Sequence, residues 1–329
     1  MHQLDKTLHY QIYGITLSSN QRLPILTPAS NTATADVEVN LTEGELSHQD
    51  KEDKHLRGWY AQQKADGIYY CLSLRGSSET LDVEIAPTGK QIWIKRTNLP
   101  LEEVTAILLG CVLGTALRLQ GKICLHSSVI AVGNRAIAII GAKGAGKSTT
   151  AAALAKLGCP ILADDIAVLA DCGDTISVQP GYPRLRLWKP AVNALYGSEV
   201  ELSRVFRQVD KHFVELNQDG ASTWCFHSKP LPLAAIYILG ERQPKLAAAS
   251  IEPISPHTGM MHLLTHKYPQ SLKLERDRQA LEFAYLGSLV TTVPIRQLNR
   301  PDSLDALPQL CDAIFEDVAG LGIFNFTRC

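Results

Sequence analysis

The chain has 329 residues, of which 45% are hydrophobic and 20% are charged. This composition is typical of a globular protein with a sizeable apolar core, and the length predicts about two domains. Lysine and arginine together number 32 against 33 aspartates and glutamates, which gives a formal net charge of -1. Because positive and negative charges are nearly equal in number, we do not expect the main partner to be nucleic acid or an anionic membrane.

The cysteines and the apolar stretches indicate a cytoplasmic protein. Eight cysteines are scattered along the chain, without a CxxC pair or a Cys/His cluster at metal-ligand spacing, which favours reduced thiols. The first ten residues lack the pattern of a signal peptide. The most apolar stretch, residues 107–117, is shorter than the ~18–20 residues of a membrane span and predicts a buried helix.

Residues 1–98 are predicted to form a β-rich N-terminal domain. Short runs of β-branched and aromatic residues are separated there by Gly, Pro, Asn or Asp, as in a series of strands. The expected strands cover residues 11–17, 35–41, 67–74, 80–86 and 91–96. The polar segment 43–57 is expected to be a solvated loop or a surface helix. No catalytic constellation stands out in this part of the chain.

Residues 99–329 are predicted to form an α/β domain. A helix is expected over 101–120, followed by strands at 122–132 and 135–140, a glycine-rich loop at 141–146, a helix over 147–158 and a strand at 160–163. Strand, glycine loop, helix and strand in this order are typical of nucleotide-binding folds. Further strands are expected near 177–182, 184–188, 212–216, 234–240, 250–254 and 294–298, and helices over 257–268, 275–290 and 303–318.

Residues 141–148 match the phosphate-binding pattern G-x-x-x-x-G-K-[ST] at every fixed position. The expected nucleotide-binding residues are Gly141, Ala142, Lys143, Gly144, Ala145, Gly146, Lys147, Ser148 and Thr149. Glycines allow the backbone N–H groups to turn toward phosphate oxygens, and the following helix directs its N-terminus at the same anion. Lys147 is expected to contact the β- and γ-phosphates and the Ser148 hydroxyl to ligate Mg²⁺. A glycine-rich turn without a ligand is the alternative.

Asp164 and Asp165 end the next apolar strand, where they would face the phosphates. Two buried carboxylates are costly without partners, and a metal ion together with a substrate hydroxyl would account for both. Neighbouring strand residues point to opposite faces, so both can act only if the backbone turns there. The alternative is an acidic turn at the surface. His126 lies in the strand-like run before the loop. Considered by itself, a single histidine in a strand is more typical of packing than of catalysis.

The run from residue 125 to residue 165, LHSSVIAVGNRAIAIIGAKGAGKSTTAAALAKLGCPILADD, resembles the catalytic core of the HPr kinase/phosphorylase family. The resemblance implies a P-loop fold similar to that of phosphoenolpyruvate carboxykinase. It also implies that Lys147 and Ser148 serve the phosphates and Mg²⁺, that Asp165 takes the proton of a substrate serine, that Asp164 lies beside the metal, and that His126 belongs to the active site. Residues 1–98 look more like the N-terminal part of HPr kinase-like proteins encoded beside peptide-modification genes, some of which phosphorylate lasso peptides.

One signature of this family, Glu-x-Arg-Gly-x-Gly, is missing. The corresponding region reads GYPRLRLWKP, with Arg184 and Arg186 but no carboxylate, which puts one metal ligand and the dephosphorylating activity in doubt. The two arginines alternate with leucines and would share one strand face. Arg186 is therefore a candidate for the phosphoryl oxygens, whose geometry suits a guanidinium. For Arg184 and for Lys211 a solvated strand charge is the preferred interpretation.

The sequence thus predicts a cytoplasmic kinase dependent on ATP and Mg²⁺, which transfers the γ-phosphoryl group to a hydroxyl. The expected partner is a peptide or protein that bears a serine, without nucleic acid or membrane, and a homo-oligomer is compatible with this prediction. A ParA/MinD-type ATPase is a rival because of the extra Lys143, and a GTPase is disfavoured by the lack of an N-K-x-D motif. A nucleotide-dependent binding or scaffold protein without kinase activity is the non-catalytic alternative.

Overall fold

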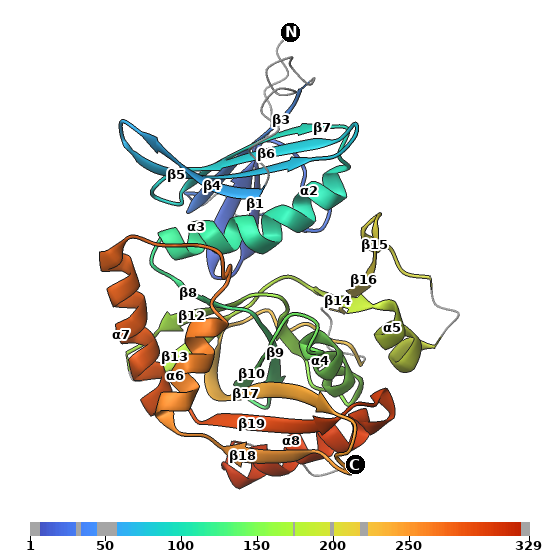
Figure 1. Ribbon diagram of the computed structural model, residues 1–329. Coiled ribbons are helices and arrows are strands. Elements are labelled where there is room, and N and C mark those ends of the chain that lie inside the picture. Colours follow the sequence, from blue (N-terminus) through green and yellow to red (C-terminus); the bar gives the residue numbers. More distant parts are fainter. Residues whose placement is uncertain are drawn as a thin grey trace. The chain divides into compact units, whose positions relative to one another are not determined.

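The computed structural model describes residues 7–30, 34–44, 58–173, 175–197, 201–217 and 223–323. It divides the chain into two compact units (Figure 1), each described here by itself. Unit 1 comprises Met1–Lys122 with Ser271–Leu274, and unit 2 comprises Ile123–Gln270 with Glu275–Cys329. Most of the polar segment predicted at 43–57 lies outside the described residues. Among the described helices, none combines the length and the apolar character that a membrane crossing needs.

Unit 1 contains a seven-stranded sheet in the order β1-β2-β3-β7-β6-β5-β4. Its strands are β1 (Leu8–Ile12), β2 (Ile15–Ser19), β3 (Val37–Glu43), β4 (Gly58–Lys64), β5 (Gly67–Arg75), β6 (Thr80–Ile85) and β7 (Gln91–Thr97). Strand β3 pairs in parallel with β2 and β7, and the other pairs are antiparallel. Buried and exposed residues alternate along β3 and β7, because one face of the sheet is covered.

The first hairpin differs from the prediction of a single strand over 11–17. The chain turns at Tyr13 and Gly14, whose φ angles are 54° and 72°, so β1 and β2 pair with each other. Two successive residues with positive φ are the geometry of a tight type I′ turn, which follows the twist of the paired strands. The usual Asn-Gly or Asp-Gly signal is absent here, and the predicted single strand is wrong for that reason.

A nearly continuous apolar helix follows the sheet of unit 1. It consists of α2 (Leu101–Ile107), the π-helical segment η1 (Leu108–Val112) and α3 (Leu113–Leu119). The amide of Gln120 donates a 2.9 Å hydrogen bond to the carbonyl of Gly89, and a Cβ at Gly89 would lie 2.2 Å from the Ala116 carbonyl oxygen. The helix is thus grouped with the N-terminal sheet, and the first unit extends to Lys122 rather than to the expected boundary at residue 98.

Unit 2 is built on a nine-stranded sheet in which the long strand β17 (Leu231–Gln243) belongs to two branches. One branch has the order β11-β9-β10-β17-β19-β18, and in the other β17 pairs with β13, which leads to β12 and β8. The strands are β8 (Ile123–Leu125), β9 (Ser127–Val132), β10 (Arg135–Ile140), β11 (Ile161–Ala163), β12 (Ala167–Asp171), β13 (Ile176–Gln179), β18 (Ser250–Pro253) and β19 (Ile295–Pro301). A three-stranded sheet joins β14 (Arg184–Trp188), β16 (Val209–Glu215) and β15 (Arg204–Phe206).

Helices cover both faces of the branch that contains β10 (Figure 1), which makes the chain a mixed α/β protein. The helices are α4 (Lys147–Lys156), α5 (Lys189–Tyr196), α6 (Pro256–Thr265), α7 (Arg276–Thr292) and α8 (Leu307–Gly320), with a short 3₁₀ segment η2 (Leu304–Ala306) before α8. In β10, Ile137 and Ile139 join the core beneath α4 and α8, whereas Ala138 and Ile140 join the core beneath α6 and α7. Burial on both faces explains why this strand is apolar throughout instead of alternating.

The parallel strands of unit 2 bring distant segments to one edge of the sheet. Strand β17 pairs in parallel with β10 on one side and with β19 on the other. The carboxyl ends of parallel strands meet at a common edge, where α/β proteins bind their ligands. The loop at 141–146 follows β10, Arg242 lies near the end of β17, and Arg300 lies near the end of β19.

Candidate functional site

The glycine loop, residues 141–146, connects β10 to α4 as the sequence predicts. Gly146 precedes the helix with a φ of 105°, a conformation that side-chain-bearing residues rarely adopt. Lys147 begins the helix, and its Nζ donates hydrogen bonds to the carbonyls of Gly141 (3.0 Å) and Ala142 (3.2 Å). Lys147 therefore connects the two ends of the loop. Lys143, in the middle of the loop, is exposed.

Lys147 is a buried cation, and opposing influences act on its pKa. Only 6% of the residue is exposed, and burial lowers the pKa of its ammonium group to about 8. The nearby carboxylates of Asp164 and Asp165 act in the opposite direction and favour the charged form, whereas Lys211 lowers the pKa further. A further anion placed in the loop would therefore stabilise the protonated lysine.

The carboxylate of Asp164 joins three elements of unit 2. Its Oδ1 accepts hydrogen bonds from the hydroxyls of Ser128 on β9 (2.7 Å) and Ser148 on α4 (2.8 Å). Its Oδ2 accepts a hydrogen bond from the backbone N–H of Arg186 on β14 (3.0 Å). The residue is only 3% exposed, so these donors replace the water that would otherwise solvate the charge.

Asp165 also faces the site because the backbone turns immediately after Asp164. The φ of Asp165 is 73°, so the two neighbouring carboxylates are not directed to opposite faces, as they would be in a continued strand. Oδ2 of Asp165 lies 3.3 Å from Nη1 of Arg186, and Oδ1 lies 3.7 Å from Nε2 of His126. The backbone turn that would allow both carboxylates to act together is therefore present. The carboxylate of Asp165 lies between a guanidinium and an imidazole.

The surrounding cations keep Asp165 ionised. Burial by itself would raise the pKa of this carboxyl, but the positive charges of Arg186, Lys211 and Lys147 outweigh it and hold the pKa below its ordinary value. The Lys211 side chain thus contributes to the field of the site from β16.

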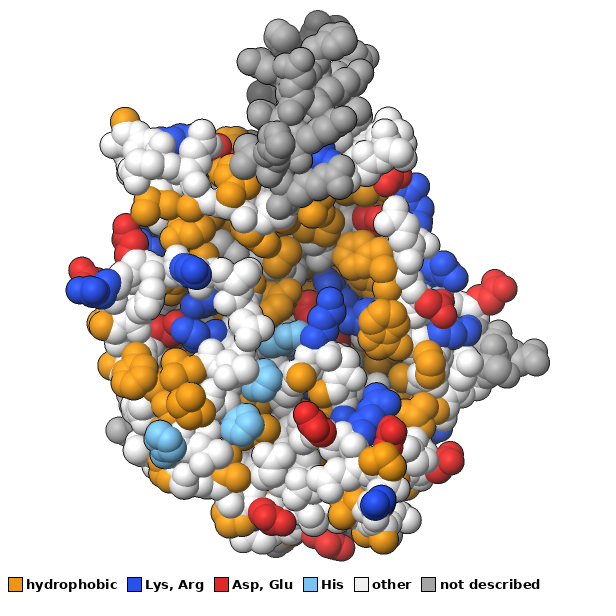
Figure 2. Space-filling view, viewed as in Figure 1, with side chains coloured by type: hydrophobic (Ala, Val, Ile, Leu, Met, Phe, Trp, Pro, Cys, Tyr) orange, Lys and Arg blue, Asp and Glu red, His pale blue; other side chains and the backbone are white. Residues whose placement is uncertain are grey.

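His126 lies at the break between β8 and β9, and not within one strand as the sequence suggests. The two strands pair with different neighbours, and the His126 N–H donates instead to the carbonyl of His266 at 2.8 Å. Its ring meets the Tyr268 ring edge-on, with 5.3 Å between centroids. Burial, assisted by Lys147, lowers the pKa of His126 to about 4, so the ring is neutral at neutral pH. Figure 2 shows histidine side chains gathered on one face of the molecule.

Arg186 is held against Asp165 by aromatic rings. Its guanidinium lies 5.8 Å from the centroid of Tyr182 and 5.7 Å from that of Phe213. Arg184 shares this strand face, as expected, because its guanidinium lies 5.4 Å from the same Phe213 ring. Arg184 forms an ion pair of 2.8 Å with the exposed Glu215, which fits the preferred interpretation of a solvated strand charge.

Sequence reasoning missed two residues of the site. Ser128 is a fully buried hydroxyl in an otherwise apolar strand. A polar residue in such a run could have been predicted to bind a buried polar group. Arg300, from β19, donates a hydrogen bond through Nη2 to the carbonyl of Ala145 in the glycine loop. No local pattern marks Arg300, because its partner is 155 residues away and only the strand order brings them together.

The hydroxyl of Ser148 and the carboxylate of Asp164 fit a shared Mg²⁺ ion. Both are oxygen donors of the kind that this cation prefers, and the ion commonly uses one or two protein ligands together with phosphate oxygens and water. Within the described ranges, no group of three or more His, Cys, Asp and Glu side chains is arranged to hold a metal ion. The pair therefore suits an ion that arrives with a phosphate better than one enclosed by protein alone.

Comparison with models of protein families finds no match, and neither does comparison with curated proteins. One solved structure, described as the Hpr(Ser) kinase/phosphatase from Coxiella burnetii, aligns over 60% of this chain and 98% of its own. The sequence identity is 8% and the TM-score is 0.32. A TM-score this low does not establish a common fold, and the function proposed below rests on the geometry of the site.

The network around Asp164 predicts a stability effect. Asp164→Ala leaves the hydroxyls of Ser128 and Ser148 and the N–H of Arg186 without their acceptor, and should lower the free energy of unfolding by about 3 kcal/mol. Urea unfolding followed by circular dichroism measures this change. Asp277→Ala, at an exposed position in the first turn of α7, is the matched control and should lower stability by at most about 1 kcal/mol, the loss of its interaction with the helix dipole. Equal effects of the two substitutions would contradict the assignment.

Proposed function

We propose that this chain is a kinase that uses ATP and Mg²⁺ and transfers the γ-phosphoryl group to a serine hydroxyl of a peptide or protein. The observation that carries the proposal is the convergence of the glycine loop with Lys147, of the Ser148–Asp164 pair and of a second carboxylate, Asp165. Phosphoryl transfer needs an anion cradle, cations that balance the developing charge, and a group that positions the attacking hydroxyl. The glycine loop would serve as the cradle, Lys147 and Mg²⁺ at the Ser148–Asp164 pair would supply the cations, and Asp165 would position the hydroxyl.

The phosphates would lie in the glycine loop at the N-terminus of α4. There the backbone N–H groups and the helix dipole favour an anion, and Lys147 adds a full positive charge. In the structure Nζ of Lys147 is bonded to two loop carbonyls, which a phosphate oxygen would replace as its partner. Ser148 and Asp164 would hold Mg²⁺, which would neutralise part of the phosphate charge.

The two carboxylates differ in a way that separates their roles. Asp164 is occupied by three donors and is suited to holding a cation in a fixed place. Among the described residues, none donates a hydrogen bond to Oδ1 of Asp165, because Nε2 of His126 is 3.7 Å away, and this oxygen would be open to an incoming hydroxyl. Its lowered pKa keeps it ionised, so it can accept the hydroxyl proton and orient the attacking oxygen. Asp165 is thus the proposed base, with Arg186 positioning it and His126 beside it as a further proposed member of the active site.

The proposed acceptor is an extended peptide, and unit 1 offers a surface for one. Strand β4 is an edge of the seven-stranded sheet, and its residues are half-buried or exposed. An exposed edge strand can pair with a peptide backbone as an added strand, which is a recurrent mode of peptide binding. An extended peptide would gain main-chain hydrogen bonds at this edge, which a small molecule would not.

Asp165→Asn should separate chemistry from binding. The amide cannot take the hydroxyl proton, so transfer from radiolabelled ATP to a serine peptide should fall by at least about 100-fold. Affinity for Mg-ATP should stay nearly unchanged, because Asp165 is not placed on the metal. Asp164→Asn is the matched control and should weaken Mg²⁺-dependent binding of ATP. If the two variants exchange these effects, the roles of base and metal ligand are reversed.

The pKa of Lys147 predicts how binding depends on pH. Because the phosphates favour the protonated lysine, affinity for Mg-ATP should be full below the pKa of about 8 and should be lost as the pH rises above it. Calorimetric titration on either side of this pKa measures the change. Lys147→Ala should abolish both strong binding and its alkaline decline, whereas Lys156→Ala, at the far end of α4, should keep both. An alkaline decline that persists in Lys147→Ala would show that another group is responsible.

We further propose that the kinase works essentially in one direction. Attack of inorganic phosphate on a phosphoserine needs a metal ion that holds both phosphates in place, and the region corresponding to the Glu-x-Arg-Gly-x-Gly signature reads GYPRLRLWKP here, without that carboxylate. A phosphoserine peptide incubated with inorganic phosphate and Mg²⁺ should therefore release no pyrophosphate above the rate without protein. Efficient release, at a rate comparable to that of the forward reaction, would overturn this proposal.

A further inference from the structure

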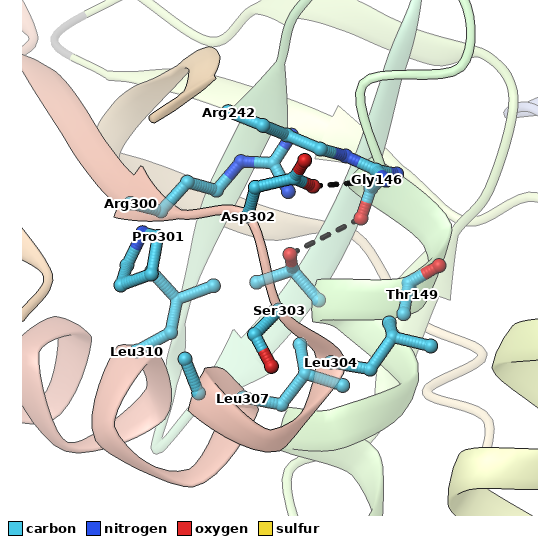
Figure 3. Close-up of a pocket in the computed structure, with 12 residues that line it drawn as sticks. Gly146, Thr149, Arg242, Arg300, Pro301, Asp302, Ser303, Leu304, Leu307 and Leu310 are labelled. Atoms are coloured by element: carbon cyan, nitrogen blue, oxygen red, sulfur yellow. Dashed lines mark hydrogen bonds and ion pairs between the residues drawn. The ribbon is translucent and has the colours of Figure 1, made fainter. Parts of the chain in front are cut away.

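A pocket opens beside the glycine loop, between the end of β19 and the start of α8 (Figure 3). Its volume is about 180 Å³. One wall is formed by Gly146, Thr149 and Thr150, which belong to the loop and the first turn of α4. The pocket therefore adjoins the place where the proposed function puts the phosphates.

The remaining walls combine two cations with an apolar floor. Arg242 and Arg300 lie on one side of the pocket and Leu304 and Leu307 on the other. A flat ring between them would meet a guanidinium plane on one face and aliphatic carbon on the other, and both contacts are favourable for an aromatic base. This arrangement is less suited to a second phosphate, which would gain nothing from the leucines.

Arg300 has an unused donor in this pocket. The residue is 9% exposed, and its Nη2 is bonded to the carbonyl of Ala145, but its Nε has no hydrogen-bond partner among the described residues. A buried N–H without an acceptor is costly, and a ligand with a ring nitrogen or carbonyl oxygen would remove this cost. The pocket is thus incomplete in a way that points to a ligand.

At the mouth of the pocket lies a carboxylate suited to a sugar. Asp302 is about half exposed and lies 3.5 Å from Arg242. Carboxylates at the carboxyl ends of parallel strands commonly accept hydrogen bonds from ribose hydroxyls. Asp302 directly follows β19, one of the three parallel strands whose ends meet here.

We propose that this pocket binds the base and ribose of the nucleoside triphosphate whose phosphates occupy the glycine loop. The inference rests on the proposed function, and it assigns the nucleoside to a site formed by the ends of β17 and β19. Pockets that enclose a whole small ligand measure about 300–1,000 Å³, so a volume of about 180 Å³ suits a base with part of its sugar rather than an entire nucleotide. The phosphates would extend from it past Thr149 into the loop.

The test compares ATP with inorganic triphosphate, which carries the phosphates without the nucleoside. Calorimetric titration of the full chain with Mg²⁺ should show ATP binding at least about tenfold more tightly than triphosphate. Ala306→Phe places a ring in the pocket and should remove about tenfold in affinity for ATP while triphosphate affinity changes by less than about twofold. Gln309→Phe, which adds the same ring at an exposed position of α8 outside the pocket, should leave both affinities unchanged.

The outcomes separate this inference from the proposed function. If triphosphate binds to the unaltered chain as tightly as ATP, or if Ala306→Phe weakens both ligands equally, the pocket does not hold the nucleoside, although phosphate binding stands. If the unaltered chain binds neither ligand, the proposed function falls together with the inference. Retained triphosphate binding also shows that Ala306→Phe is folded, and the comparison of ligands on the unaltered chain needs no variant.

Discussion

The buried carboxylate of Asp164 is the interaction on which the rest of the site depends. It ties β9, α4 and β14 to one point through the hydroxyls of Ser128 and Ser148 and the N–H of Arg186. A charge buried this deeply is tolerated only because every bond to it comes from a donor fixed by secondary structure. The same three bonds set the position of Ser148 on the first turn of α4 and of the strand that carries Arg186.

A chain of electrostatic consequences follows from this arrangement. The fold buries Lys147 beside two carboxylates, so burial lowers the pKa of the lysine while the carboxylates sustain its charge. Burial and the charged lysine together keep His126 neutral, and the arginine and lysines keep Asp165 ionised. Buried cations, a neutral ring and an ionised carboxylate therefore coexist within a small volume, and this combination suits the proposed phosphoryl transfer to a hydroxyl.

The local parts of this arrangement could be predicted from the sequence, and the non-local parts could not. The loop between β10 and α4 follows from a contiguous motif, and the end of β11 before Asp164 follows from a short apolar run. The break at His126 separates β8, which pairs with β12, from β9, which pairs with β10 and β11, and the positive φ of Asp165 lies at the turn between β11 and β12, so neither follows from the local residue pattern. The turn at Tyr13 and Gly14 was missed because hairpin turns are recognised by residue types that are absent there. The sequence predicts that Arg186 contacts phosphoryl oxygens. In the structure its guanidinium lies against Asp165, a contact that the residue pattern does not reveal.

The contact between Arg300 and the Ala145 carbonyl also bears on the order in which the protein matures. Chains emerge from the ribosome N-terminus first, and domains generally fold as they appear. The Ala145 carbonyl in the glycine loop is translated 155 residues before the arginine that braces it, and β10 precedes both its parallel neighbour β17 and the strand β19 that pairs with β17. A nascent chain that already contains the whole loop therefore lacks the brace and the sheet edge that shape it. The candidate site is therefore complete only after β19 and Arg300 have been translated and paired with the earlier strands.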